Sequence, residues 1–547
     1  MKKFLILFGV IILAPLLFMS QQSSANNVND FIADIGSFEI LSSYQGRNNV
    51  LKVDAAKTQY TIASFSLGQY IGRTIAIEFT ADVRREGTGG LIKWSVLNHV
   101  NNQQYYPEVV GVENATSGQW YNMKGKIIIT PTQNDAMLYL TNWDNEFGGL
   151  SRDIFYIANP TVTITEGNFI NPDFSLTPLK DIYVNHFLIG NITNADGTYL
   201  SGRHFDLLKH HFNIVTSTET FPYQLAPSSK GGTYNWAKAD YSTNLMIRNN
   251  IAVFGHCLIY PDASVTPAWM TEGTREEVIQ NMNDDITTVV RHFRGRINAW
   301  DVVVEALRYD GITARDARGD WRNCLNDSVQ RSGIYSPKNP WFDKLGSDYI
   351  ELAFRAARAA DPNITLYYQD HGFEDPNRAE VARKMIQEIN DKYKRETGGT
   401  RNLIEGINSQ SHITTSQARI TLSTLNNAYF NNVRAGLDKL VSLGIEIAIG
   451  ELDISTVGFS KGQGRDTVMS ERDAIAQARA YAQLMQIYKD YSAHIKRVTF
   501  WGIDDNTSWL SSGNPTLFDW RLNAKQSFHA VSDPDGFLRQ HSGGTRR

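Results

Sequence analysis

The chain has 547 residues, which at about 150 residues per domain predicts two or three domains. Hydrophobic residues make up 42% and charged residues 20%, a globular composition that excludes a chain disordered throughout. The 53 Lys and Arg residues nearly balance the 57 Asp and Glu residues, so the charge favours neither nucleic acid nor an acidic membrane as a partner. Two cysteines exclude a disulfide-rich scaffold, an iron–sulfur cluster and a four-cysteine zinc site.

The N-terminus reads as an export signal. Lys2 and Lys3 precede an apolar run from Phe4 to Met19, and the small residues Ser23 and Ala25 follow it. This order predicts a signal peptide over 1–25, with cleavage after Ala25 and an extracellular or periplasmic mature protein without membrane contact. The alternative is an uncleaved anchor, for which the run is short. In that compartment the two cysteines could form a disulfide or stay as free buried thiols.

Residues 26–167 predict an all-β domain. Short runs that are β-branched or alternate in polarity recur there, such as Thr74–Thr80, Lys126–Thr130 and Met137–Thr141. Turns rich in Gly, Asn and Asp separate them at short intervals, and helical periodicity is nearly absent. The pattern predicts a β-sandwich of the jelly-roll, galactose-binding type, followed by a linker over 168–180.

Residues 181–535 alternate short apolar strands with long amphipathic stretches, and 536–547 remain as a tail. We expect helices at Asp348–Ala360, Arg378–Tyr393 and Glu471–Tyr488. Eight strands with interleaved helices predict an α/β fold, a (β/α)8 TIM barrel. The expected strands are His186–Asn191, Asn213–Thr216, Ile251–Tyr260, Asn298–Glu305, Ile364–Gln369, Gly406–His412, Glu446–Glu451 and Val498–Gly502.

Two carboxylates stand where apolar strands meet the predicted barrel mouth, the end at which such folds place their chemistry. Trp300-Asp-Val-Val-Val-Glu305 ends on Glu305, and Ile447-Ala-Ile-Gly-Glu451 ends on Glu451. Two carboxylates facing each other can act as acid and nucleophile on a glycosidic bond. Any one such residue could be merely structural, but three further strand ends supply polar or aromatic groups. These are His256, Gln410 with His412, and Trp501.

At these residues the chain resembles the catalytic domain of glycoside hydrolase family 10, the xylanase family. The order and spacing of the motifs match over about two-thirds of the chain. They are His211–Asn213, Tyr234–Asp240, Gly255–His256, Thr266–Trp269, Trp300–Glu305, Gly406–His412, Gly450–Ile454, Phe500–Gly502, Ser508–Trp509 and Pro515–Asp519.

The resemblance implies a retaining glycoside hydrolase with Glu451 as nucleophile and Glu305 as general acid/base. Retention implies carboxyl groups about 5–5.5 Å apart. His412 should hydrogen-bond Glu451 and keep it ionised. The resemblance also implies substrate contacts from His412 and from four more residues, and the chemistry needs no metal or organic cofactor. These four residues are His256, Gln410, Trp501 and Trp509.

Four departures from the family fall on the side of the cleft that holds the glycone. Val304 stands where the family usually has an Asn that binds the 2-hydroxyl of the reacting sugar. Thr218–Pro222 replaces a Glu-Asn-Glu-Met-Lys run, Tyr260-Pro261 replaces Trp-His, and Gln369–His371 replaces Asn-Asp-Tyr. Because a contact to that hydroxyl can contribute several kcal/mol in the transition state, these changes should slow the enzyme or alter which sugar fits.

The N-terminal sandwich is similar to carbohydrate-binding modules of families 4, 9 and 22, through Ser117–Gly125 and Asp153–Ile157. The resemblance implies polysaccharide binding through exposed aromatic residues, and the alternative is a spacer domain. The candidate aromatics are Trp94, Tyr105, Tyr106, Trp120 and Trp143.

Three functions are therefore compatible with the sequence. The first is a secreted, monomeric endo-β-1,4-xylanase whose partner is the backbone of xylan, a β-1,4-linked polysaccharide. The second is a family relative acting on another β-glycoside, which the altered glycone residues favour. The third is a non-catalytic carbohydrate-binding protein, which Val304 and Pro261 favour and the retained carboxylate pair disfavours.

Overall fold

The computed structural model describes most of the chain. The described residues are 22–25, 27–31, 37–58, 61–100, 102–141, 150–167, 172–329, 337–416, 427–458 and 469–541. Most of the predicted signal peptide, residues 1–21, lies outside them. Its last four residues form strand β1 (Gln22–Ala25), which pairs with β11 (Ile154–Glu166).

The N-terminal part folds into two antiparallel sheets, as the sequence predicts. One sheet has the order β2–β3–β11–β5–β9, with β1 beside β11, and the other has the order β4–β10–β6–β7, with β8 beside β6. The predicted strands are present and two of them are longer than expected. The bounds not yet given are β2 (Phe38–Tyr44), β3 (Arg47–Asp54), β4 (Thr61–Ser66), β5 (Ile75–Glu86), β6 (Gly90–Val100), β7 (Gln103–Tyr105), β8 (Glu108–Ala115), β9 (Trp120–Ile129) and β10 (Met137–Thr141).

An aromatic core fills the space between these sheets. Trp94 is fully buried there, with its ring 4.4 Å from Phe79 and 5.8 Å from Phe31. The expectation that Trp94 and Tyr105 are exposed is therefore wrong, and both are at most 1% exposed. Trp94 is buried in the core of the sandwich, whereas Tyr105 is buried against the barrel. Tyr106 is 48% exposed. Arg47 lies over the ring of Trp120, and Trp143 lies outside the described residues.

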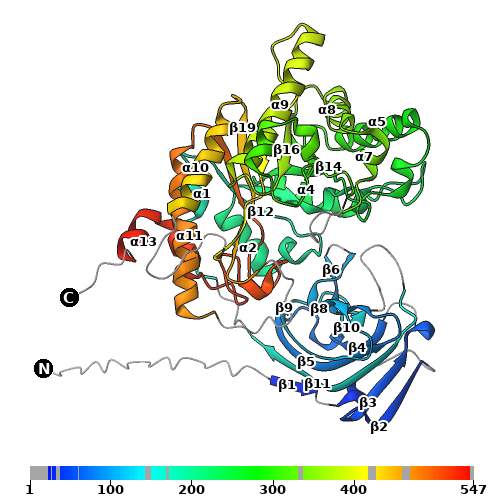
Figure 1. The fold of residues 1–547 in the computed structure, drawn as a ribbon. Helices are drawn as coiled ribbons and strands as arrows, with labels where there is room; N and C mark the ends of the chain where they lie inside the picture. The colour runs from blue at the N-terminus through cyan, green and yellow to red at the C-terminus, as the bar shows by residue number, and fades with distance from the viewer. Residues whose placement is uncertain are drawn as a thin grey trace, which may run out of the picture.

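The C-terminal part is a closed barrel of eight parallel strands, which confirms the predicted fold class. The strands follow the chain order around the barrel, and pairing of the first with the last closes it. Figure 1 shows the helices around the barrel and the sandwich, in blue, against one side of it. The strands are β12 (Leu188–Ile192), β13 (Ile214–Ser217), β14 (Ala252–Ile259), β15 (Ala299–Val304), β16 (Thr365–Asp370), β17 (Gly406–Ser409), β19 (Glu446–Ser455) and β20 (Ile495–Phe500).

The helices fall where amphipathic runs predict them, and each begins and ends within a few residues of the expected bounds. Asp348–Ala360 is α8, as expected, whereas Arg378–Tyr393 extends to Pro376–Thr397 in α9 and Glu471–Tyr488 to Glu471–Asp490 in α11. The other principal helices are α2 (Gly202–His211), α4 (Ala237–Arg248), α5 (Arg275–His292), α10 (Asn427–Val441), α12 (Gln526–Ser532) and α13 (Pro534–Gln540).

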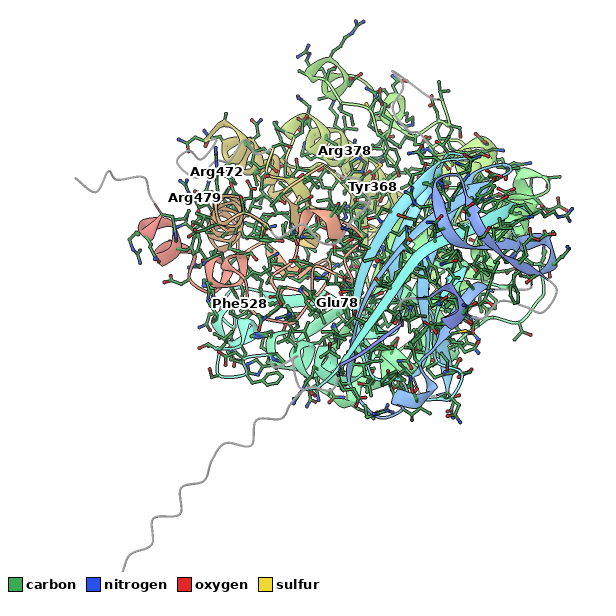
Figure 2. All side chains as sticks on the ribbon, turned by 90° about the horizontal axis from the view of Figure 1, so that it is seen from below. Glu78, Tyr368, Arg378, Arg472, Arg479 and Phe528 are labelled. Atoms are coloured by element: carbon green, nitrogen blue, oxygen red, sulfur yellow. The ribbon has the colours of Figure 1, made fainter. Side chains whose placement is uncertain are left out.

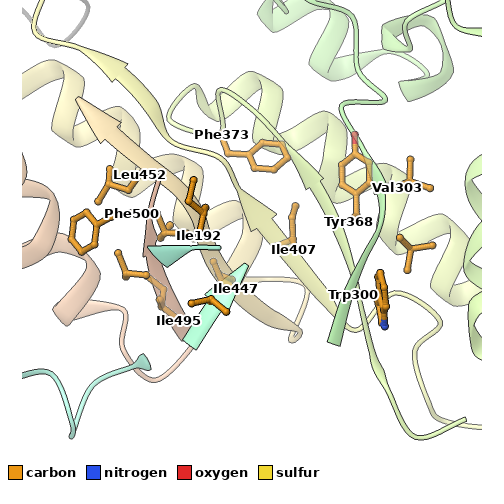
Figure 3. Close-up of a cluster of buried hydrophobic side chains, with 14 of the residues drawn as sticks. Ile192, Trp300, Val303, Tyr368, Phe373, Ile407, Ile447, Leu452, Ile495 and Phe500 are labelled. Carbon is orange, nitrogen blue, oxygen red and sulfur yellow. The ribbon is translucent and has the colours of Figure 1, made fainter. Parts of the chain in front are cut away.

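Branched and aromatic side chains fill the barrel and the space between its strands and helices (Figure 3). Ile407, Ile447 and Ile495 come from three neighbouring strands and are fully buried. Trp300 packs against the backbone at Gly255, where a Cβ atom would lie 2.3 Å from the indole ring. The glycine is therefore needed for this contact between β14 and β15.

The sixth strand differs from the prediction. The run Gly406–His412 is interrupted after Ser409, and His412–Thr414 forms a separate short strand, β18, beside β19. Ser411 has a φ of 64°, the left-handed conformation that breaks the extended run. The break places Gln410 and His412 at separate points of the barrel mouth.

Besides its own core, the sandwich shares a second buried core with the barrel. Ala76, Tyr105 and Ile128 of the sandwich belong to the same hydrophobic cluster as the barrel residues. When the molecule is viewed from below, the sandwich strands lie in front of the barrel (Figure 2). Cys257 and Cys324 are buried free thiols, which settles the open question of their pairing. Among the described residues no helix is long and apolar enough to span a membrane.

Candidate active site

A cleft of about 1140 Å³ opens where the barrel strands end. All seven site residues predicted from the sequence line it, from five different strand ends. They are His256, Glu305, Gln410, His412, Glu451, Trp501 and Trp509.

Glu451 lies inside β19 and is only 4% exposed, yet both of its carboxylate oxygens have partners. Oε2 lies 2.9 Å from Nε2 of His412, and Oε1 accepts a 2.8 Å hydrogen bond from Nε2 of Gln369. Nε2 of His256 lies 3.8 Å from Oε1. Burial alone would raise the pKa of Glu451, but the hydrogen bonds and the charge of His412 outweigh burial and lower it. Glu451 is therefore ionised at neutral pH, as expected.

His412 lowers the pKa of Glu451 because the histidine is charged. A second carboxylate on the other side of its ring favours that charge. Its Nδ1 lies 2.9 Å from Oδ1 of Asp453, whose Oδ2 accepts a 2.8 Å hydrogen bond from the indole of Trp509. Burial lowers the pKa of His412, but the charges of Asp453 and Glu451 raise it to about 10. The ring is therefore an imidazolium at neutral pH and donates to both carboxylates.

Glu305 follows β15 in the left-handed conformation, with a φ of 46°, and its amide donates to the carbonyl of Gln369. Oε1 accepts a 2.7 Å hydrogen bond from Nε2 of Gln410, and Oε2 accepts one from the hydroxyl of Tyr309. Burial and the charge of Glu305 raise the pKa of Tyr309 well above its ordinary value, so the phenol remains a donor. Glu305 is only partly buried, in contrast to Glu451.

A buried polar network supports His256 from inside the barrel. Its Nδ1 lies 2.9 Å from Oδ2 of Asp301, and Asn408 donates to both oxygens of that carboxylate. The ring of Trp501 meets His256 edge to face, with centroids 5.7 Å apart. His256 and Trp501 thus have fixed orientations beside Glu451.

Gln369 is a site residue that sequence reasoning missed. It was noted only as a departure from the family, but its side chain binds Glu451, and its Oε1 has no partner in the described part of the chain. Val304 is its register partner on the neighbouring strand and is 1% exposed. The signal was the coincidence of two changes on paired strands: the family's Asn is lost at position 304, and the family's Asn at position 369 is replaced by the longer Gln.

The wall beside Val304 is aromatic. Phe221 lies 4.8 Å from the ring of His256, and it stacks on Tyr223 at 5.5 Å and on Tyr260 at 6.3 Å between centroids. Thr218, also in this wall, has a buried hydroxyl without a partner among the described residues. This side of the cleft therefore combines an apolar surface with a few unused hydrogen-bonding atoms.

Comparisons with known proteins agree with this geometry. Residues 178–534 match the model of glycosyl hydrolase family 10. An endo-1,4-beta-xylanase A from Thermotoga neapolitana is 29% identical over 443 residues, which are 77% of this chain and 37% of that protein. This chain thus spans little more than a third of that relative's length.

Two further relatives match over most of their own length. A beta-1,4-xylanase from Dictyoglomus thermophilum is 29% identical over 362 residues, 64% of this chain and 90% of that protein. The crystal structure of a xylanase of the same family with a bacterial Ig-like domain, from termite gut, has 27% sequence identity and a TM-score of 0.58. It covers 83% of this chain and 95% of that one.

Proposed function

Because the chain belongs to glycosyl hydrolase family 10, we propose that it is an exported, retaining endo-β-1,4-xylanase that cleaves the backbone of xylan. One observation carries the proposal: Glu305 and Glu451 line the same cleft, and each has its own set of donors. The relatives named as xylanases support the choice of substrate. A non-catalytic role would leave unexplained why His412 and Gln369 hold a buried carboxylate ionised.

In the first step, Glu451 attacks the anomeric carbon while Glu305, in its acid form, protonates the leaving oxygen. The C–O bond of the glycosidic linkage breaks, and a bond from the anomeric carbon to Glu451 forms. The imidazolium of His412 keeps Glu451 anionic and stabilises it again as a leaving group in the second step. Gln410 and Tyr309 orient the carboxyl group of Glu305.

In the second step, Glu305 as a carboxylate takes a proton from water, and the water oxygen attacks the anomeric carbon. Glu451 departs as a carboxylate, and two inversions leave the β configuration unchanged. Trp501 and Trp509 are well placed to contact the sugar, because both line the cleft and Trp509 is 37% exposed.

A second candidate is action on a different β-glycoside. Val304 and the aromatic wall of Phe221 and Tyr260 favour it, since apolar groups replace polar contacts on the glycone side. The unpartnered atoms of Gln369 and Thr218 supply other hydrogen bonds there. A sugar with a different pattern of hydroxyl groups would satisfy them.

The test is a product screen with the mature protein. Xylan, arabinoxylan, mixed-linkage glucan and aryl β-xylosides are incubated with it, and products are identified by chromatography and by NMR of the first anomer formed. β-Configured xylo-oligosaccharides from xylan support the proposal, and an α-configured first product contradicts retention. Hydrolysis of another glycan alone supports the second candidate, and hydrolysis of none overturns the xylanase proposal.

We also propose export and a carbohydrate-binding function for the sandwich. The apolar run Phe4–Met19 supports export, and mass spectrometry of the secreted protein would locate the cleavage site. Cleavage after Ala25 would remove strand β1, so in the mature protein residues 162–165 of β11 would lose the partner that β1 provides. The exposed Tyr106 is the best-placed described aromatic among the candidates for polysaccharide binding.

A further inference from the structure

The sandwich meets the barrel beneath two loops that form one wall of the cleft. The first loop, 193–198, follows β12 and the second, 217–223, follows β13. Asn194 of the first loop and Thr218 of the second line the cleft. The resemblance to the family places the second loop on the glycone side.

Tyr105, at the end of β7, is a sandwich residue that contacts the first loop. It is 1% exposed, and its ring lies so close to Gly197 that a Cβ atom there would be 2.3 Å from it. Gly197 has a φ of +79°, which favours glycine. The backbone of the loop therefore rests directly on the tyrosine ring.

A charged side chain of the barrel also contacts the same ring. The ammonium group of Lys238, on α4, lies 4.4 Å from the ring centroid, within the range of a cation–π contact. Burial lowers the pKa of Lys238, against the charges of Glu219 and Asp196. Burial, together with the charge of Glu219, raises the pKa of Tyr105. Tyr105 and Lys238 thus form one contact across the domain interface.

Hydrogen bonds connect the first loop to the second loop, and the second loop to His256. The hydroxyl of Thr193 donates to Glu219 and accepts a 3.1 Å hydrogen bond from the amide of Thr218, which joins the two loops. The hydroxyl of Thr220 donates to the carbonyl of His256 and accepts from its amide, at 2.8 and 3.0 Å. His256 in turn faces Glu451.

We propose that Tyr105 is a positioning residue through which the sandwich holds this wall of the cleft in place. The sandwich is then part of the catalytic unit, in addition to any binding of polysaccharide. The expected change in kcat/KM rests on the proposed function. The expected change in the order of the two loops does not depend on the substrate.

The experiment compares two contacts of the same kind across the same interface. Tyr105→Ala removes the ring beneath Lys238. Lys126→Ala removes the matched contact, in which a sandwich lysine lies 5.1 Å from the ring of Trp520 in the barrel. Tyr105→Phe keeps the ring and removes only a hydroxyl without a partner in the described residues. Lys238→Met replaces Tyr105→Ala if that variant does not fold.

Hydrogen–deuterium exchange of residues 193–198 and 217–223 is measured, with kcat and KM on aryl β-xylobiosides. Tyr105→Ala should speed exchange in both loops and lower kcat/KM by about ten- to a hundredfold, since misplacement by 1 Å can have such an effect. Tyr105→Phe and Lys126→Ala should match the wild type in both measurements.

Equal exchange and equal kinetics in Tyr105→Ala and Lys126→Ala would overturn the inference. If the wild-type protein cleaves no xyloside, the proposed function fails, whereas loop exchange still decides the positioning by Tyr105. The measurements of kcat and KM are then repeated on the glycoside that the product screen identifies.

Discussion

At the scale of single residues, the negative charge of Glu451 is central to the proposed reaction. His412 and Gln369 donate to this carboxylate, and His256 lies close by. Glu451→Gln should lower kcat to below about a hundredth of the wild-type value, since the nucleophile is removed while the shape is kept. The measurement is initial rates on xylan and on an aryl xyloside, with circular dichroism to verify folding. Retention of more activity would mean that Glu451 does not form the covalent bond.

His412 predicts a dependence of stability on pH. Its pKa is about 10 in the folded protein and about 6.5 in the unfolded chain, so folding favours the protonated form. The stabilisation is complete below pH 6.5 and is lost as pH rises toward 10, by at most about 1.4 kcal/mol per pH unit. Urea unfolding at pH 7, 8, 9 and 10 should show this decline in the wild type. His412→Gln should lack it, and a parallel decline in both proteins would contradict the assignment.

Substitution of Val304 tests whether the glycone site is a xylanase site that lacks one hydrogen-bond donor. Val304→Asn restores an amide beside Glu305 at little cost in volume, and it should raise kcat/KM on xylo-oligosaccharides by up to about a hundredfold. Val304→Leu is the apolar control, for which no gain is expected. No gain on xylan from Val304→Asn, together with a loss on another glycoside, would favour the second candidate function. The free Oε1 of Gln369 is a competing partner for the new amide.

At the scale of elements, β14 and β15 depend on a close contact between backbone and indole. Gly255→Ala would place a methyl group 2.3 Å from the ring of Trp300, and overpacking of this kind should lower the free energy of unfolding by about 1–3 kcal/mol. Gly311→Ala is the matched control, because nothing lies within 4 Å of its Cβ position. Thermal unfolding of the two variants checks the prediction, and equal melting temperatures would contradict it.

At the scale of the whole molecule, the shared core predicts what deletion of the sandwich does. Removing 22–167 would expose the barrel surface that covers Tyr105 and Ile128. We therefore expect a lower melting temperature and a loss of kcat/KM on soluble xylosides as well as on insoluble xylan. A loss confined to insoluble xylan would instead show that the sandwich acts only as a binding module.

The sequence by itself predicted the fold class, and the site residues that it proposed all line one cleft of the barrel. The strands are short apolar runs and the helices are amphipathic, so local periodicity was sufficient to predict both kinds of element. Glu305 and Glu451 could be recognised because barrel folds place chemistry at the ends of strands, and the spacing of motifs matched one family. Each strand, helix and motif depends on residues that are near one another in the chain, and the order of the motifs along the chain supplied the rest.

Only the tertiary structure decided the contacts between distant segments. Gln369 donates to Glu451 across 82 residues of sequence, and neither residue predicts the other. Tyr105 lies in a domain interface, and Trp94 lies in a core. Local pattern could not distinguish these positions from an exposed binding surface, because an aromatic residue on a strand suits all three environments. Burial is set by what packs against the strand, which is a property of the folded chain.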